Sequence, residues 1–99
     1  MKKINKFENI LSDVCYESPN GTSFYIQSHG VDSNKNPRYV LYMSMENILK
    51  IKDNKKNNFG GRVYDVRDEE KCRFIFTSYN LSEDIKFLFE ICKIDTHLE

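Results

Sequence analysis

The sequence predicts a small, mainly β fold of the α+β class, in which an antiparallel, partly open β-barrel is closed by one C-terminal helix. The last third of the chain carries most of this prediction. Residues 62–67 and 72–78 are rich in strand formers, an acidic run at 68–71 separates them, and helical spacing follows over 82–93. Seven Phe, six Tyr and no Trp also favour a β-rich core.

Composition limits the classes of protein and of partner. The 99 residues predict one domain over residues 1–97, with Leu98-Glu99 set aside as a candidate cloning remnant. Fifteen basic residues balance fifteen acidic ones, so no direct nucleic-acid partner is expected. We also expect no membrane span, because no apolar run is long enough for one, and no signal peptide, because the first residues are polar. The protein is therefore expected to be soluble and intracellular.

The cysteines predict neither a disulfide framework nor a zinc site. There are three of them, far apart and without C-x-x-C spacing: Cys15, Cys72 and Cys92. We interpret them as buried free thiols in a reducing compartment. No metal and no cofactor are expected.

Residues 4–16 fit two kinds of element. Their apolar side chains recur three and four positions apart, which favours a helix, at Ile4, Phe7, Ile10, Leu11 and Val14. The residues from Ile10 to Tyr16 also alternate between apolar and polar, as in a strand, so both readings stay open.

The middle of the chain predicts a series of strands and turns. Turn residues occupy 18–21 and 30–37, and strand formers follow each of them at 22–27 and 38–43. Residues 45–52 are interpreted as a short turn that leads into another strand. The polar stretch 53–61, with paired glycines at its end, predicts a long hairpin loop.

The C-terminal helix has recognisable start and end signals. Ser82 is the expected N-cap, and the acidic Glu83 and Asp84 complement the helix dipole in the first turn. One apolar stripe runs along the helix at Ile85, Leu88, Phe89 and Cys92. Three further side chains widen the stripe: Phe87, Ile91 and Ile94. This width favours a helix sunk into a barrel mouth; the alternative is that the wider edge meets a partner or a ligand.

No motif in the chain predicts catalysis. The P-loop, nucleophile-elbow and H-E-x-x-H patterns are all missing from the sequence. His29 and His97 have no Cys or Glu at metal-ligand spacing, and the acids at 68–70 are interpreted as a solvated turn. We therefore expect a protein that is not an enzyme.

Charge segregation is the strongest functional signal. Positive residues gather between positions 50 and 62, where they outnumber Asp53: Lys50, Lys52, Lys55, Lys56 and Arg62. A basic hairpin loop of this kind can receive an acidic peptide or a lipid phosphate. The alternative is an ordinary solubilising loop.

Three segments resemble the pleckstrin-homology-like (PH-like) superfamily, which includes PH and GRAM domains. Residues 43–51 resemble a strand with apolar positions at Met45, Ile48 and Ile51, and residues 20–26 resemble a GRAM strand. Residues 74–86, with the sequence FIFTSYNLSEDIK, resemble the last strand and helix start of the PH-like domain at the N-terminus of a core subunit of transcription factor TFIIH. The resemblance spans roughly residues 20–94.

The resemblance implies a non-catalytic protein-interaction module of a transcription or DNA-repair factor. TFIIH-like docking of acidic segments would use Lys50, Lys52, Arg62 and Arg73. A phosphoinositide-binding module, the less favoured reading, would instead use Lys52, Lys55, Lys56 and Arg62. We expect a monomer or weak dimer, nuclear if TFIIH-like and otherwise cytoplasmic. The alternative architecture, a four-stranded antiparallel sheet between two helices (α-β4-α), is typical of small immunity or inhibitor proteins that occlude one partner protein.

Overall fold

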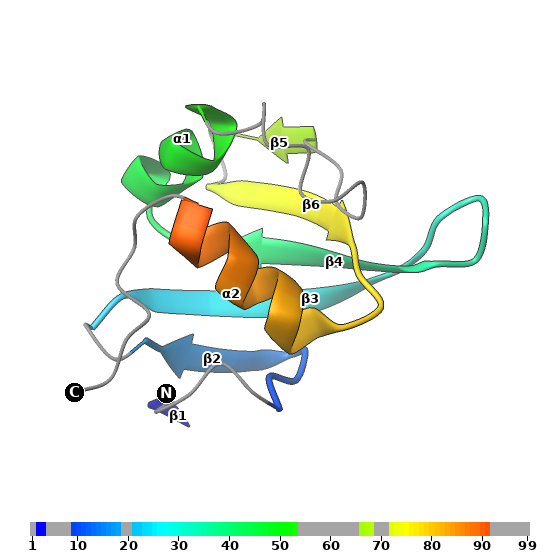
Figure 1. The fold of residues 1–99 in the computed structure, drawn as a ribbon, viewed down its shortest axis with the longest axis horizontal. Helices are drawn as coiled ribbons and strands as arrows, with labels where there is room; N and C mark the ends of the chain where they lie inside the picture. The colour runs from blue at the N-terminus through cyan, green and yellow to red at the C-terminus, as the bar shows by residue number, and fades with distance from the viewer. Residues whose placement is uncertain (1, 4–8, 19–20, 54–65, 69–71, 92–99) are drawn as a thin grey trace.

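The structure, a computed structural model, describes residues 2–3, 9–18, 21–53, 66–68 and 72–91. Two helices accompany the strands of a single sheet (Figure 1). In chain order the elements are β1 (Lys2–Lys3), β2 (Val14–Glu17), β3 (Ser23–Val31), β4 (Pro37–Tyr42), α1 (Met45–Asp53), β5 (Val66–Asp68), β6 (Arg73–Thr77) and α2 (Leu81–Ile91).

The sheet has six strands in the order β1-β2-β3-β4-β6-β5. β1 pairs with β2 in parallel, and every other neighbouring pair is antiparallel. β1 and β5 are the two edges, and no described pairing joins them, so the sheet is open in the part of the chain that the structure describes. The predicted α+β class is confirmed, whereas closure into a barrel is not seen among the described strands.

Alternation along the strands gives the sheet an apolar inner face. Ile26, Leu41 and Phe74 lie opposite one another in register on three adjacent strands, and all are fully buried. Because successive side chains of a strand point to opposite faces, the residues between them lie on the other face. The core cluster of the protein therefore lies on one side of the sheet.

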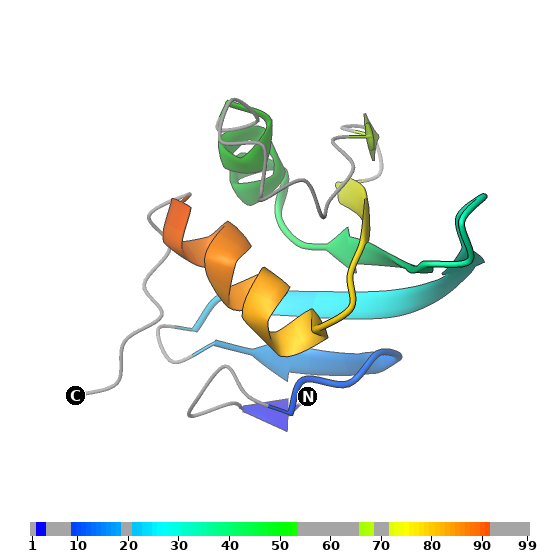
Figure 2. The ribbon, with the colours of Figure 1, turned by 45° about the vertical axis from the view of Figure 1, so that its right-hand side comes forward.

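α2 covers the inner face (Figures 1 and 2). Its Ile85, Leu88 and Phe89 are fully buried in the core, and the Phe89 ring meets Phe24 of β3 edge to face at 5.1 Å. The predicted apolar stripe is confirmed at these three positions. Phe87, on the wider edge of the stripe, is half-buried against the core. For Ile91 the structure describes only the backbone, and Cys92 and Ile94 lie outside the described residues.

The N-terminus of α2 is fixed by polar contacts. The helix begins at Leu81, and the Asn80 carbonyl side chain accepts a hydrogen bond from the Glu83 backbone N–H at 3.2 Å. Asn80 is therefore the N-cap, and the prediction of Ser82 was wrong. The Ser82 hydroxyl instead accepts a hydrogen bond from the Ile10 backbone N–H at 2.7 Å, which ties the N-terminal segment to the helix.

α1 replaces the strand that was predicted over residues 45–52. The Ser44 hydroxyl accepts a hydrogen bond from the Asn47 N–H at 3.3 Å and so caps the helix. Ile48 and Ile51, three residues apart, are both fully buried in the core beside β6. Met45 is 47% exposed. The segment whose resemblance to PH-like domains depended on three apolar strand positions thus forms a helix that buries only two of them.

The N-terminal segment also differs from the favoured prediction. Val14–Glu17 form strand β2, and residues 9–13 are not helical, because Asn9 and Asp13 have positive φ angles of 57° and 65°. The buried side chain of Tyr16 holds this segment in place. Its side chain is 2% exposed, and its hydroxyl accepts a hydrogen bond from the Leu11 N–H at 2.9 Å. The strand alternative is correct over 14–16, and residues 4–8 lie outside the described part.

The predicted strands at 22–27, 38–43 and 72–78 are confirmed as β3, β4 and β6. β3 runs on to Val31, further than expected, because a bulge between Ser28 and Val31 lets the hairpin continue. Gly30 lies in this bulge with φ +70°, a conformation that glycine adopts without strain. Of the strand predicted over 62–67, only the end is described: Val66 and Arg67 belong to β5, together with Asp68, which was expected in the turn.

Candidate functional site

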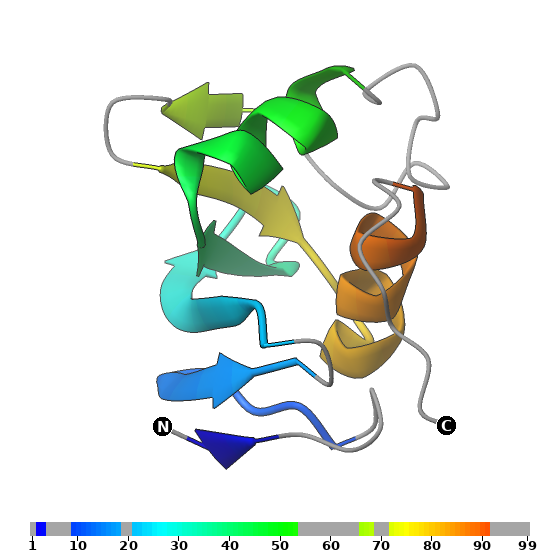
Figure 3. The same cartoon turned by 90° about the vertical axis from the view of Figure 1, so that its left-hand side faces the viewer.

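The candidate site is the outer face of the sheet, the face opposite α2. Figure 3 shows that no described helix lies on this side. Its side chains alternate with those of the core on the central strands, and the register aligns them in rows. One row contains Cys15, Tyr25, Tyr42 and Arg73, the next contains Gln27, Val40 and Ile75, and the third contains Arg38 and Thr77.

Two tyrosines form the centre of the first row. The rings of Tyr25 and Tyr42, on neighbouring strands, have centroids 5.9 Å apart and planes inclined by 32°. The Tyr42 hydroxyl donates a hydrogen bond to the Gln27 side-chain oxygen at 3.1 Å. Both rings are half-buried, so each keeps surface available for contact. The pair is an aromatic patch held in place by its neighbours.

Val40, in the second row, is only 1% exposed, yet it lies outside the core cluster. Ile75, its partner on β6, is half-buried. These two aliphatic side chains make the middle of the outer face apolar. A sheet face that faces only water carries mainly polar side chains, and this face differs from it in having an apolar centre.

Two arginines flank the apolar centre. Arg73 lies opposite Tyr42 in register, and Arg38 lies four positions before Tyr42 on β4, a spacing of about 13 Å along the strand. Both side chains are half-buried and already interact within the chain. Among the described side chains of this face, Glu17 at the end of β2 is acidic, two strands away from β4. By register, Asp68 of β5 lies opposite Arg73, so the two arginines of this face are matched in number by two acidic residues, Glu17 and Asp68.

The basic residues predicted as the partner-binding site are only partly described. Lys55, Lys56 and Arg62 lie outside the described residues, and for Lys52 the structure describes only the backbone, in α1. The side chains of Lys50 and Arg73 are described, and they belong to different elements, α1 and β6.

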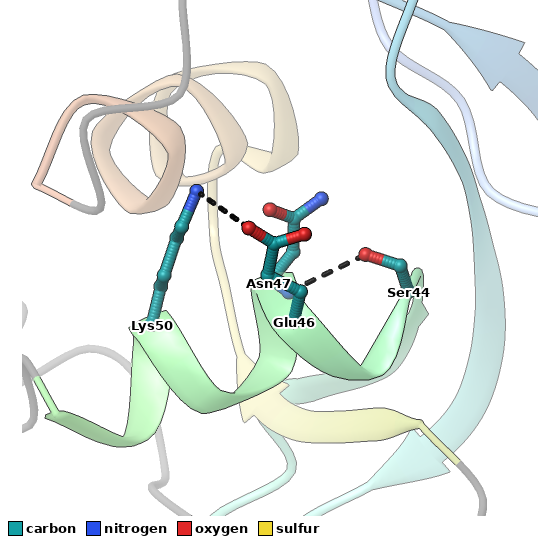
Figure 4. Close-up of polar contacts among 4 residues, drawn as sticks. All are labelled: Ser44, Glu46, Asn47 and Lys50. Carbon is teal, nitrogen blue, oxygen red and sulfur yellow. Dashed lines mark hydrogen bonds and ion pairs between the residues drawn. The ribbon is translucent and has the colours of Figure 1, made fainter.

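Lys50 forms an ion pair within its own helix. Its Nζ lies 3.9 Å from the Glu46 carboxylate, one turn away, as Figure 4 shows. The two side chains are 43% and 82% exposed, so the pair is screened by solvent and contributes little to stability. The pair does offset the charge of Lys50, and this makes the lysine a weaker anion receptor than its sequence context suggested.

One carboxylate outside the outer face has a shifted pKa. The Ser12 hydroxyl, followed by the Ser28 backbone N–H, lowers the pKa of Asp13 below its usual value. The Ser28 hydroxyl also donates to Asp13 at 3.1 Å. Asp13 is exposed, and these contacts join the segment before β2 to β3. This cluster is a structural tie between two segments.

The described cysteines and the described histidine lie on different parts of the fold. Cys15 is exposed on β2, which corrects the prediction that it is buried, and Cys72 is half-buried. His29 is exposed on β3, while Cys92 and His97 lie outside the described residues. Within the described residues, no three His, Cys, Asp or Glu side chains lie close enough together to hold a metal ion.

The sequence reasoning missed the outer face. Tyr25, Arg38 and Tyr42 were assigned to strands, but their common face was not considered. The signal was present in the sequence, because Tyr25 alternates with the buried Phe24 and Ile26. An aromatic residue on the face opposite the core of a half-buried strand is a sign of a contact surface.

Among the described helices, none is long and apolar enough to cross a membrane.

Comparison with known proteins places the chain in a phage family. No curated protein and no solved structure matches the chain significantly. The family model described as Staphylococcus phage terminal repeat-encoded protein TreK matches residues 20–97, which is most of the chain and includes the sheet from β3 onward. The chain therefore belongs to the family of the Staphylococcus phage terminal repeat-encoded protein TreK.

Proposed function

We propose that the protein is a non-catalytic binding module that docks an acidic segment of a partner protein on the outer face of its sheet. One observation carries the proposal: the half-buried pair Tyr25 and Tyr42 lies on a partly apolar sheet face, in the same row as Arg73 and two rows from Arg38. Tyrosine and arginine are the residue types that contribute most to the energy of protein interfaces. The apolar centre supports desolvation on binding, and the arginines select for acidic groups.

The arginines can serve a partner even though each already interacts within the chain. A guanidinium has five N–H donors, so interaction within the chain is compatible with contact to a partner. Its planar fork also matches the geometry of a carboxylate. The proposal therefore places the acidic segment beside Arg73 and Arg38, while Lys50, already paired with Glu46, has a secondary role.

The test is titration of a fluorescent acidic peptide into the purified protein at low and high salt. The proposal predicts affinity in the micromolar range that weakens with salt, because the attraction is partly exposed to solvent. Arg73→Gln and Arg38→Gln should each weaken binding. Lys86→Gln, which removes the same charge from the exposed side of α2, should leave it unchanged.

Three results would count against this function. Equal peptide affinity in the three variants would mean that the acidic segment binds away from Arg38 and Arg73. Loss of peptide binding in Lys50→Glu alone would mean that the segment binds at α1. Sedimentation with anionic lipid vesicles, in the absence of peptide binding, would favour the phosphoinositide alternative. Circular dichroism of each variant confirms that a loss of binding is not a loss of fold.

The alternative function is occlusion of a single partner protein. Because the family is that of a phage protein, a partner is expected among the proteins of the bacterium or of the phage. Occlusion of a single partner protein predicts nanomolar affinity for that protein and indifference to generic acidic peptides. Affinity capture with the wild type and with Tyr42→Ser separates the two ideas. A protein held at nanomolar affinity by the wild type but not by the variant, without any peptide binding, would favour occlusion.

Of the proposed PH-like arrangement, we keep only the last strand and the C-terminal helix. β6 followed by α2 agrees with the last strand and helix of the resemblance, whereas α1 disagrees with its strand at residues 43–51. The roles in transcription and DNA repair, and the nuclear location, came only from the TFIIH resemblance. The match to a phage family lends them no support.

A further inference from the structure

The segment before β2, residues 9–13, joins the start of α2 to the sheet, and we call it the strap. In Figure 1 it is the blue loop beside the end of β2, where α2 begins. Ile10 is 5% exposed and belongs to the same core cluster as Phe24 of β3 and Phe89 of α2. The other four residues of the strap are exposed or half-buried. One apolar side chain therefore anchors the strap in the core.

Side-chain hydroxyls hold the first half of the strap, in place of the backbone ladder that holds a strand. The Ile10 backbone N–H donates a hydrogen bond to the Ser82 hydroxyl at 2.7 Å, and the Leu11 N–H donates one to the Tyr16 hydroxyl at 2.9 Å. Ser82 lies in the first turn of α2, and Tyr16 is buried on β2. The strap thus contacts the helix at one residue and the sheet at the next, so we expect both contacts to break together when Ile10 leaves the core.

Both ends of the strap have a conformation suited to a hinge. Asn9 and Asp13 have positive φ angles of 57° and 65°. Asn and Asp adopt this left-handed conformation more readily than most other residues that carry a side chain. The Asp13 carboxylate accepts hydrogen bonds from the Ser28 N–H at 3.3 Å and from the Ser28 hydroxyl at 3.1 Å, and both contacts are exposed. Water can therefore take the place of Ser28 when the strap moves.

We propose that the strap opens and closes as a unit while the sheet and α2 stay folded. Local opening is expected where few apolar side chains are buried and where hydrogen bonds lie near the surface, and the strap has both properties. β2 stays in the sheet in the open state, because its residues pair with β3 and not with the strap. Opening removes Ile10 from the core and exposes the apolar site that it fills, beside the first turn of α2. This device is separate from the proposed docking surface, which lies on the other face of the sheet.

Amide hydrogen exchange, followed residue by residue by NMR at low concentrations of urea, tests the proposal on the wild-type protein. The N–H groups of Ile10 and Leu11 report on the strap, because each is hydrogen-bonded when the strap is closed. After correction for intrinsic rates, they should exchange at least about 100-fold faster than the amides of β4. Their exchange should also respond little to urea, because opening the strap exposes little surface.

Two results of this experiment would overturn the proposal. Strap amides that exchange as slowly as those of β4, with the same dependence on urea, would mean that the strap opens only when the whole protein unfolds. Strap amides that exchange at their intrinsic rates would mean that the strap does not close.

Variants of the strap give a second test. Ile10→Ala removes the anchor and should speed exchange of the Leu11 amide about tenfold or more. Ser82→Ala removes the acceptor of the Ile10 N–H and should speed it about fivefold. Leu11→Ala is the matched control, because Leu11 is 62% exposed, and it should change exchange of the Ile10 amide by no more than about twofold.

The response of β4 in the Ile10→Ala variant distinguishes a separate strap from a part of the common core. Loss of the strap can destabilise the remaining fold only by the free energy with which the strap closes. Exchange of the β4 amides should therefore rise by no more than the factor by which closure protects the strap amides of the wild type. A larger rise would overturn the proposal, because Ile10 would then support the whole core.

Discussion

Ser78→Ala tests how α2 is held on the sheet. Ser78 follows β6 and is 2% exposed, and its hydroxyl donates a hydrogen bond of 2.5 Å to the carboxylate of Asp84, which is 1% exposed. The contact joins the end of the strand to the first turn of the helix. The alanine variant leaves a buried carboxylate with one donor fewer, while the rest of the core is unchanged.

The expected cost follows from the charge and burial of the acceptor. A hydrogen bond to a charged group contributes about 1.5–3 kcal/mol, and loss of one partner in a buried site leaves the other to bear the desolvation penalty. The whole domain is expected to be stable by about 5–15 kcal/mol, so this single contact is a substantial share of that free energy. With a urea m-value of about 2 kcal/mol/M, the unfolding midpoint should fall by about 1 M.

The assay is urea unfolding followed by far-ultraviolet circular dichroism, with Ser33→Ala as the matched control. Ser33 is exposed in the β3–β4 loop, so the same substitution there should change stability by less than about 0.5 kcal/mol. A Ser78→Ala midpoint equal to that of the control would refute the reasoning, because it would mean that the Asp84 carboxylate is not desolvated or does not depend on Ser78. Peptide binding by the folded variant should be unchanged, since Ser78 is not on the outer face.

Three further changes test other parts of the account. Phe89→Ala should lower the free energy of unfolding by about 3–5 kcal/mol in the same assay, because its fully buried ring packs on Phe24; a loss below about 1 kcal/mol would contradict this packing. Asp13→Asn should be less stable than the wild type at pH 7. Because the pKa of Asp13 is lower in the folded than in the unfolded state, the ionised carboxylate stabilises the fold above the unfolded-state pKa near 3.9. This stabilisation is lost as the pH falls through the folded-state pKa, so the unfolding curves of the two proteins should converge as the pH falls below about 4. A difference in stability that persists in acid would argue against this role of Asp13. Gly30→Ala should cost about 1 kcal/mol by thermal unfolding, from its positive φ alone, because an added Cβ meets nothing within 4 Å; an unchanged melting temperature would show that the bulge relaxes.

The local sequence predicted an element correctly where the spacing of its apolar residues matches the residues that the element buries in the core. β6 and α2 are examples, because the alternation of Phe74 and Phe76 and the spacing of Ile85 and Leu88 each fit only one kind of element. The cap of α2 was wrong by two positions, since both Asn80 and Ser82 can cap and the Ser82 hydroxyl receives the N–H of Ile10 from the distant N-terminal segment.

The predictions were wrong for segments whose apolar residues fit both the helical period and the strand period. Ile48 and Ile51 fit a helix, but the strand-rich neighbourhood and the family resemblance favoured a strand over residues 45–52, and the Ser44 cap was overlooked. In residues 9–17 helical spacing competed with alternation, and the buried Tyr16 next to Phe24 decided for the strand. Tertiary packing, which local sequence does not contain, settled both cases.

The candidate site depended even more on long-range pairing. The sequence drew attention to the basic residues between 50 and 62, because like charges close together in a chain are easy to recognise. The outer face depends instead on the register of three strands, which brings Tyr25, Tyr42 and Arg73 into one row although they are far apart in sequence. A search for half-exposed aromatic residues that alternate with buried ones would have found Tyr25 and Tyr42, but not their neighbour on β6.

The central claim is that the outer face of the sheet is the partner-binding surface. The most direct measurement is backbone and side-chain NMR of the labelled protein, titrated with the acidic peptide at low salt. The account predicts that the largest shift changes fall on Tyr25, Tyr42, Arg73 and their neighbours on the outer face, with small changes on α2. Shift changes confined to α1 around Lys50, or spread evenly over the molecule, would contradict it.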